Sequence, residues 1–323
     1  MTPRAICILS FLLLFQGCSQ VGVRKALRPQ AQAPEGAPKL LAIYEPWFGH
    51  PRHISVGYSS QDPTILAKQV DEAKALGISG FVVDWYGDRE PFLDRAYALL
   101  QIIAARKNFN IAMMYDETED DNGQATDDAV AALTKFSEKY LAPNGPGREA
   151  YLTYQDRPVI FIFPKGGHTD WKRVRQETDT WNPRPLLIYE DQSTPFADAF
   201  DGFYAWINPG RKGWAQDGSN WGEDYLRDFY RRMQANPKKI AVGAAWPGFD
   251  DRRAAWSLGR YISQRCGQTL NDTLRISRES YPPENPLPFL LIATWNDYEE
   301  GTAIERGLAK CDASPPKTDK TGQ

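Results

Sequence analysis

The sequence predicts a single-domain (β/α)8 TIM barrel over residues 39–307. Short apolar segments of strand length alternate along the chain with longer amphipathic stretches, and eight such strand segments can be counted. Strands joined through helices form right-handed crossovers and a parallel sheet, and eight of them are enough to close a barrel. A doubly wound open sheet is the main alternative. It is disfavoured because no glycine-rich phosphate-binding loop follows any of these strands.

The first strand and helix illustrate the pattern. An apolar strand is expected at residues 40–44, and Asp62-Pro63 then opens a helix, with Asp as the N-cap and Pro in the first turn, which Gly77 ends. The other strands are expected at 78–83, 110–115, 158–163, 185–189, 200–205, 239–245 and 289–293. Further helices are expected at 91–107, near 126–140 and at 223–235, and a hairpin arm at 150–154.

The two ends of the chain are predicted to lie outside the barrel. Residues 1–18 combine Arg4, an apolar run too short to span a membrane, and Gly17-Cys18, which is typical of an export signal. Residues 14–19 resemble a bacterial lipoprotein signal, in which Cys18 becomes the lipidated first residue; a simple secretory peptide is the alternative. Residues 19–38 are expected to be a flexible tether and residues 308–323 a disordered tail. We therefore expect an exported protein, held in the cell envelope by a lipid anchor in the membrane or secreted.

The overall composition limits the classes of protein to which the chain can belong. The chain has 323 residues, 42% of them hydrophobic, so it can bury a sizeable core, and we expect a monomer. A net charge of -3 offers no basic footprint for nucleic acid. With Cys7 removed and Cys18 modified, Cys266 and Cys311 remain, and in an oxidising compartment they can pair in a disulfide. Two unpaired thiols are the alternative.

Most of the predicted strands end at an acid or a tryptophan. In a parallel barrel all carboxyl ends of the strands lie on one face, so these side chains should converge in one acidic cleft with aromatic walls. Any one acid alone would more often be a helix cap or a surface turn, and it is their repetition at the same end that favours a cleft. The residues predicted to bind substrate there are Tyr44, Glu45, Trp47, His50, Asp84, Trp85, Asp116, Glu190, Trp206, Trp246, Trp295 and Asn296.

An acidic, aromatic cleft suits a neutral polyhydroxyl ligand, because carboxylates accept hydrogen bonds from hydroxyls and indole faces cover the apolar patches of a sugar ring. Cleavage of a glycosidic bond needs one protonated carboxyl and one carboxylate. After the eighth strand, Asp297 and Glu300 provide such a pair, since crowding of two carboxylates raises the pKa of one of them. These two are the predicted catalytic residues.

Residues 295–305, Trp-Asn-Asp-Tyr-Glu-Glu-Gly-Thr-Ala-Ile-Glu, resemble the C-terminal signature of glycoside hydrolase family 99, the endo-α-mannosidases. Their first half is closer to family 71, the α-1,3-glucanases. Residues 43–49 and 80–87 resemble the ends of the first two strands of family 99, so the resemblance spans nearly the whole barrel. By position it implies that Asp297 is the base, which in family 99 acts on the 2-hydroxyl of the substrate, and that Glu300 is the general acid. Asp297 is one methylene shorter than the Glu of that family.

The resemblance implies a glycoside hydrolase that cleaves α-linked oligo- or polysaccharides, α-mannosides or α-glucans, without a cofactor or a metal. A non-catalytic carbohydrate-binding barrel is the alternative, and a barrel enzyme with a non-sugar substrate is a third. His50 and His53 have a spacing that zinc ligands use, but the chain has only one other His. The acidic run 116–128 does not fit an EF-hand loop, and the loop 208–222 is either a lid or a mobile connection.

Overall fold

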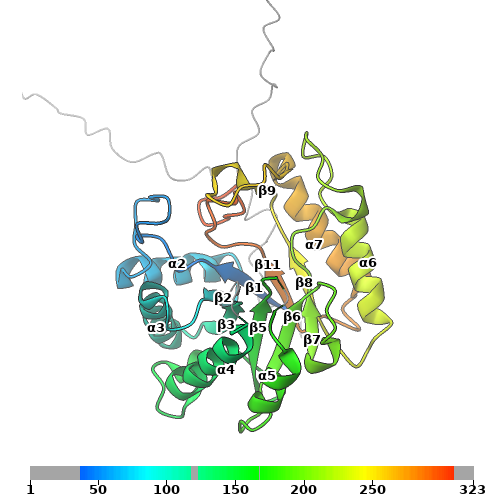
Figure 1. Cartoon of the computed structure of the whole chain (residues 1–323). Helices are drawn as coiled ribbons and strands as arrows, with labels where there is room; N and C mark the ends of the chain where they lie inside the picture. Colours follow the sequence, from blue (N-terminus) through cyan, green and yellow to red (C-terminus); the bar gives the residue numbers. More distant parts are fainter. Residues whose placement is uncertain (1–36, 118–122, 167, 309–323) are drawn as a thin grey trace, which may run out of the picture.

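The computed structural model describes residues 37–117, 123–166 and 168–308. It confirms the (β/α)8 barrel: eight parallel strands form a closed ring in the order β1-β2-β3-β5-β6-β7-β8-β11, and β11 pairs again with β1 (Figure 1). The bounds of these strands are β1 Lys39–Tyr44, β2 Gly80–Trp85, β3 Asn110–Asp116, β5 Arg157–Phe163, β6 Leu186–Glu190, β7 Gly202–Tyr204, β8 Ile240–Ala245 and β11 Phe289–Ile292. Each overlaps its predicted segment.

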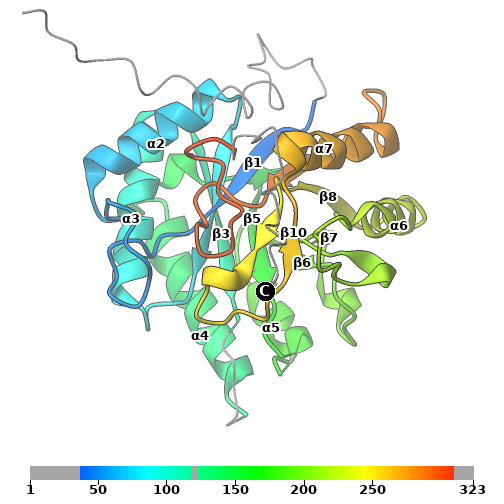
Figure 2. The same cartoon turned by 90° about the horizontal axis from the view of Figure 1, so that it is seen from above.

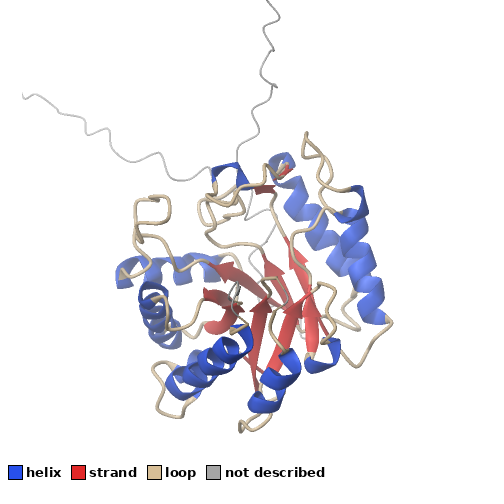
Figure 3. Ribbon diagram, in the orientation of Figure 1, coloured by secondary structure: helices blue, strands red, loops and turns tan. Residues whose placement is uncertain are grey.

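Helices surround the ring of strands (Figure 3). They are α2 Pro63–Ala75, α3 Pro91–Arg106, α4 Ala125–Phe136, α5 Trp171–Thr178, α6 Glu223–Gln234 and α7 Gln268–Ser280. The predicted start of α2 is confirmed, because Asp62 Oδ1 accepts a hydrogen bond of 2.8 Å from the backbone N–H of Thr64. The predicted hairpin arm is β4 Thr153–Tyr154, antiparallel to β5. A second hairpin, β9 Phe249–Asp250 with β10 Tyr261–Ile262, follows β8.

Side chains alternate between the barrel interior and the layer under the helices, as the period of two in a strand requires. Along β1, Leu41 and Ile43 belong to the interior cluster, whereas Ala42 and Tyr44 pack in the outer one. The same alternation holds in β2, β3, β5 and β6. It decides which side chain at each strand end faces the cleft.

Most of both chain ends lies outside the described residues. Residues 1–36, which hold the export signal, Cys18 and most of the tether, lie outside the described residues, and so do Cys311 and the rest of the tail beyond Leu308. Cys266 is disulfide-bonded, and its pairing with Cys311 stays a prediction. Among the described helices, none combines the length and the apolar composition that a membrane crossing requires.

Candidate functional site

Four acids occupy the inward-facing positions at the carboxyl ends of the strands. Tyr44 pairs with Val83 in the β1–β2 ladder, so the next residues, Glu45 and Asp84, are neighbours in the ring. Asp116 ends β3 and Glu190 ends β6. All four are buried, with exposures of 4–8%. The apolar cluster of the barrel interior therefore lies beneath a layer of acids at the mouth of the barrel.

Glu45 interacts electrostatically with two other acids of this layer and with two acids in the loop after β11. Its pKa is raised well above the ordinary range, first by burial and then by the negative charges of Asp84, Asp297, Glu300 and Asp116. Within the described part of the chain, Glu45 Oε2, Asp84 Oδ1 and Glu190 Oε2 are buried without a hydrogen-bond partner. Unpaired buried carboxyl oxygens favour the protonated form, and they can donate to or accept from a bound hydroxyl.

The two predicted catalytic acids lie in a tight loop after β11. Asp297 Oδ1 accepts hydrogen bonds of 2.9 Å from the backbone N–H groups of both Glu299 and Glu300, which fixes the carboxyl in place. Burial and the neighbouring Glu300 raise the pKa of Asp297 well above its ordinary range, and the two N–H donors oppose this rise. Burial also raises the pKa of Glu300.

Glu299 is directed away from this pair. Its Oε2 lies 2.8 Å from His53 Nδ1, and its Oε1 accepts a hydrogen bond of 3.2 Å from the backbone N–H of Ile54. Both contacts are with the loop that follows β1. Glu299 therefore connects two loops, and its carboxyl is engaged apart from the predicted catalytic pair, Asp297 and Glu300.

Lys165 is a cation of the site that the sequence analysis missed. Its Nζ lies 3.2 Å from Asp116 Oδ1, and it lies over the rings of Tyr86 and Phe163. Burial raises the pKa of Asp116 to about 6, and Lys165 limits that rise. The signal was present in the alternation of β5, because Lys165 is the next inward position after Phe161 and Phe163.

Four aromatic residues predicted to bind substrate lie in the core instead. Tyr44, Trp85, Trp246 and Trp295 have exposures of 0–1%, so they have no free face for a ligand. Tyr44 and Trp85 lie next to inward-facing acids and therefore point outward, under the helices. The indole Nε1–H of Trp246 donates to the carbonyl of Trp221 at 3.0 Å. The structure corrects the prediction for these four.

The other predicted residues have distinct positions. Trp47 stacks on His53, with ring centroids 4.6 Å apart, and the half-buried Trp206 meets Phe163 edge-on at 5.5 Å. His50 is half-buried on the loop after β1.

Asn296 is fully buried: its Oδ1 accepts from the backbone N–H of Glu45 at 2.8 Å, and its Nδ2 donates to the backbone carbonyl of Glu45 at 2.9 Å. Asn296 thus positions Glu45, and the structure corrects its predicted contact with substrate.

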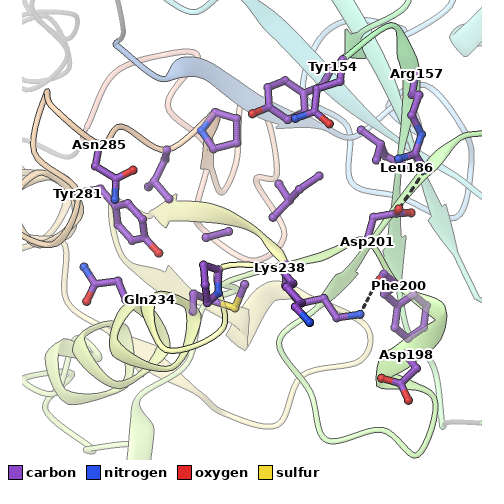
Figure 4. Close-up of a pocket in the computed structure, with 18 of the residues that line it drawn as sticks. Tyr154, Arg157, Leu186, Asp198, Phe200, Asp201, Gln234, Lys238, Tyr281 and Asn285 are labelled. Atoms are coloured by element: carbon purple, nitrogen blue, oxygen red, sulfur yellow. Dashed lines mark hydrogen bonds and ion pairs between the residues drawn. The ribbon is translucent and has the colours of Figure 1, made fainter.

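No group of three or more His, Cys, Asp or Glu side chains among the described residues is arranged to hold a metal ion. A cavity of about 630 Å³ lies at the other end of the barrel, around the starts of β5 to β8 (Figure 4). Several of its charged groups are already engaged: Arg157 is paired with Asp201 at 3.0 Å, and Lys239 donates to the carbonyl of Phe200 at 2.6 Å. The acidic mouth is the better candidate site.

The buried Glu190 predicts a dependence of stability on pH. Burial raises the pKa of Glu190 from its ordinary 4.5 to about 7 in the folded protein. The contribution of Glu190 to the free energy of unfolding should therefore be largest below pH 4.5 and fall, by at most about 3 kcal/mol, as the pH rises to 7. Urea unfolding at pH 4.5 and 7.5 measures this difference. Glu190→Gln should shrink it, and the exposed Glu284→Gln should not; an unchanged difference in Glu190→Gln would contradict the assignment.

No protein-family model matches this sequence, and no curated protein sequence matches it. Solved structures do. A GH99 endo-alpha-mannosidase from Bacteroides thetaiotaomicron has a TM-score of 0.64 at 18% identity, covering 85% of this chain and 90% of that one. Its complex with bis-tris-propane gives a TM-score of 0.60 at 19% identity, covering 85% and 89%. A glycoside hydrolase-like protein gives 0.57 at 12% identity, covering 88% and 92%. The chain therefore has the (β/α)8 fold of the family 99 endo-α-mannosidases.

Proposed function

We propose that the protein is a glycoside hydrolase that cleaves an α-linked glycan, either an α-mannoside or an α-glucan. The observation that carries the proposal is a group of three carboxyls, the buried Glu45 and Asp297 and the half-buried Glu300, which interact electrostatically at the mouth of the barrel. Mutual repulsion and burial favour a mixture of protonated and ionised carboxyls, which glycosidic cleavage requires. The endo-α-mannosidases of the same fold support the choice of an α-glycan.

In this proposal Glu300 is the general acid that protonates the leaving oxygen. Its pKa is raised by burial, and the Trp256 Nε1–H, which donates to Glu300 Oε1 at 2.9 Å, moderates the rise and orients the carboxyl. Asp297 is the base, held by two backbone N–H groups so that its other oxygen is available.

Glu45 is proposed as a substrate-binding carboxyl beside this pair, together with Asp84. Burial and neighbouring carboxylates raise the pKa of both acids, although the Lys165 cation opposes the rise at Asp84. At least one of the two is therefore expected to hold a proton and to donate it in a hydrogen bond to a sugar oxygen. The half-buried Trp206 is proposed to cover the C–H face of a sugar ring.

The test is a panel of α-mannan, α-1,3-glucan and α-1,4-glucan incubated with the purified protein. New reducing ends are measured together with binding by calorimetry. Hydrolysis of at least one glycan is expected. Binding without any new reducing ends would favour the non-catalytic carbohydrate-binding alternative, and neither binding nor hydrolysis would favour a non-sugar substrate.

A further inference from the structure

Exposed large hydrophobic side chains are concentrated at one place on the described surface. They are Trp214, Trp256 and Leu258, with exposures of 36%, 42% and 77%. Trp214 lies in the loop after β7, and the other two lie in the loop between β9 and β10. Both loops belong to the carboxyl end of the barrel, and Figure 2 shows the β9–β10 segment lying beside the loop after β11. The exposed aromatic surface is thus next to the acidic mouth.

The loop between β9 and β10 is built around a fully buried carboxylate. Asp251 accepts hydrogen bonds from the backbone N–H groups of Leu258 and Arg260, at 3.1 and 2.8 Å, and from Arg260 Nε at 2.6 Å. Charge-assisted bonds of this kind hold a loop in one conformation. The structure of this loop therefore maintains the exposure of Trp256.

This loop is fixed to the proposed general acid at two points. The backbone N–H of Asp250 donates to the carbonyl of Glu300 at 2.7 Å, and the Trp256 Nε1–H donates to Glu300 Oε1 at 2.9 Å. Trp256 also meets Trp47 edge-on, with ring centroids 6.2 Å apart. The indole of Trp256 therefore adjoins the carboxyl that would protonate the leaving group, and more than a third of it is open to solvent.

Trp214 extends the aromatic surface. Its ring centroid lies 5.3 Å from that of Phe249, and the guanidinium of Arg260 lies 5.6 Å from it. Arg260 contacts Asp251 as well, so the same residue supports Trp214 and organises the loop that carries Trp256. Both exposed indoles are consequently held on one framework.

We propose that Trp256 and Trp214 are stacking platforms for sugar units beyond the bond that is cut, so that the substrate is a chain of several sugars. This inference rests on the proposed function. Flat indole faces cover the axial C–H patches of pyranose rings, and the carboxyl tied to Trp256 places the first platform beside the leaving group. The substrate class is thus a polysaccharide or a long oligosaccharide.

The experiment measures by calorimetry the binding of α-mannan and α-1,3-glucan fragments of two and six units to Glu300→Gln, which is expected to hydrolyse them at least about a hundredfold more slowly than the wild type. The hexasaccharide of one series should bind about tenfold more tightly than its disaccharide, and Trp214→Ala should remove that gain. Trp256→Ala should weaken both fragments. Leu258→Ser is the matched control, because an aliphatic side chain offers no flat face, and it should leave both affinities unchanged.

Trp256→Phe separates stacking from hydrogen bonding. It keeps a ring but removes the donor to Glu300, so fragment binding should be largely retained. Loss of a donor to the ionised form raises the pKa of Glu300, so the alkaline limb of kcat/KM should move to higher pH in an otherwise wild-type enzyme.

Three results of the binding experiment overturn the inference. They are no binding of any fragment, a hexasaccharide affinity that Trp214→Ala leaves unchanged, or a loss of affinity in Leu258→Ser as large as in the Trp variants. The last would show that the substitutions act through the structure of the loop and not through the loss of a flat indole face. If the fragments bind in a way that depends on the two tryptophans but the wild type hydrolyses no glycan, the platforms stand and the proposed function is refuted. If the wild type hydrolyses a glycan and neither Trp214→Ala nor Trp256→Ala changes the rate, the proposed function stands and the platforms are refuted.

Discussion

Glu300→Gln is expected to lower kcat/KM for glycan hydrolysis by a factor of about 10² to 10⁴. Glutamine cannot transfer a proton to the leaving oxygen, but its Oε1 can still accept the hydrogen bond from Trp256, so the loop should keep its structure. The loss should be much smaller with an aryl glycoside that has a nitrophenyl leaving group, because such a group departs without protonation. Initial rates on both substrates measure the difference.

The control for this variant is Glu299→Gln, which changes the adjacent buried carboxyl. Because the oxygens of Glu299 are occupied by His53 and Ile54, its replacement should keep activity within about tenfold of the wild type. An equal loss of activity from both substrates in Glu300→Gln would contradict its role as the acid.

Asp297→Asn is expected to cause a loss of similar size, about 10² to 10⁴ in kcat/KM, on natural and activated substrates alike. The side-chain carbonyl of asparagine can still accept from the N–H groups of Glu299 and Glu300, so the turn should remain intact. What disappears is the negative charge and its ability to accept a proton. Thermal melting serves as the folding control.

The comparison of Asp297→Asn with Asp297→Ala makes this test sharper. Alanine also removes the acceptor of both backbone N–H groups, so it should lower the melting temperature as well as the activity, whereas asparagine should lower activity alone. If Asp297→Asn retained near wild-type kcat/KM, the carboxylate would be a structural cap and another group, with Glu45 the nearest candidate, would be the base.

The strand ends were the most predictable part of this molecule. Each barrel strand is a short apolar run bounded by polar or turn residues, and the ring then follows from the number of strands and the handedness of their connections. Because parallel strands end on the same face, Glu45, Asp84, Asp116 and Glu190 were correctly expected to share one end of the barrel.

The direction in which each side chain points follows from the alternation within its strand, and the position of the strand end alone does not give it. Tyr44 and Glu45 are adjacent, so only one of them can face the barrel axis, and a hydrophobic interior at Leu41 and Ile43 selects Glu45. Applied to β5, the same rule would have identified Lys165. The aromatic residues Tyr44 and Trp85 were assigned to the cleft from their proximity in sequence, which the alternation rules out.

Contacts between distant loops could not be predicted from the sequence. The hydrogen bond from Trp256 to Glu300 spans 44 positions, and that from Glu45 to Asn296 spans 251. Such pairs depend on how the loops pack above the barrel, and neither composition nor periodicity encodes that packing. The roles of Trp256 and Asn296 in the site are therefore apparent only from the structure.

The most direct measurement is the release of reducing ends from one α-glycan by the wild type, Glu300→Gln and Glu299→Gln at equal concentration. The wild type and Glu299→Gln should release product at rates within about tenfold of each other, and Glu300→Gln should be slower by a factor of about 10² or more. Equal rates in Glu300→Gln and the wild type, or no product from any α-glycan with the wild type, would contradict a glycoside hydrolase that uses the carboxyls after β11.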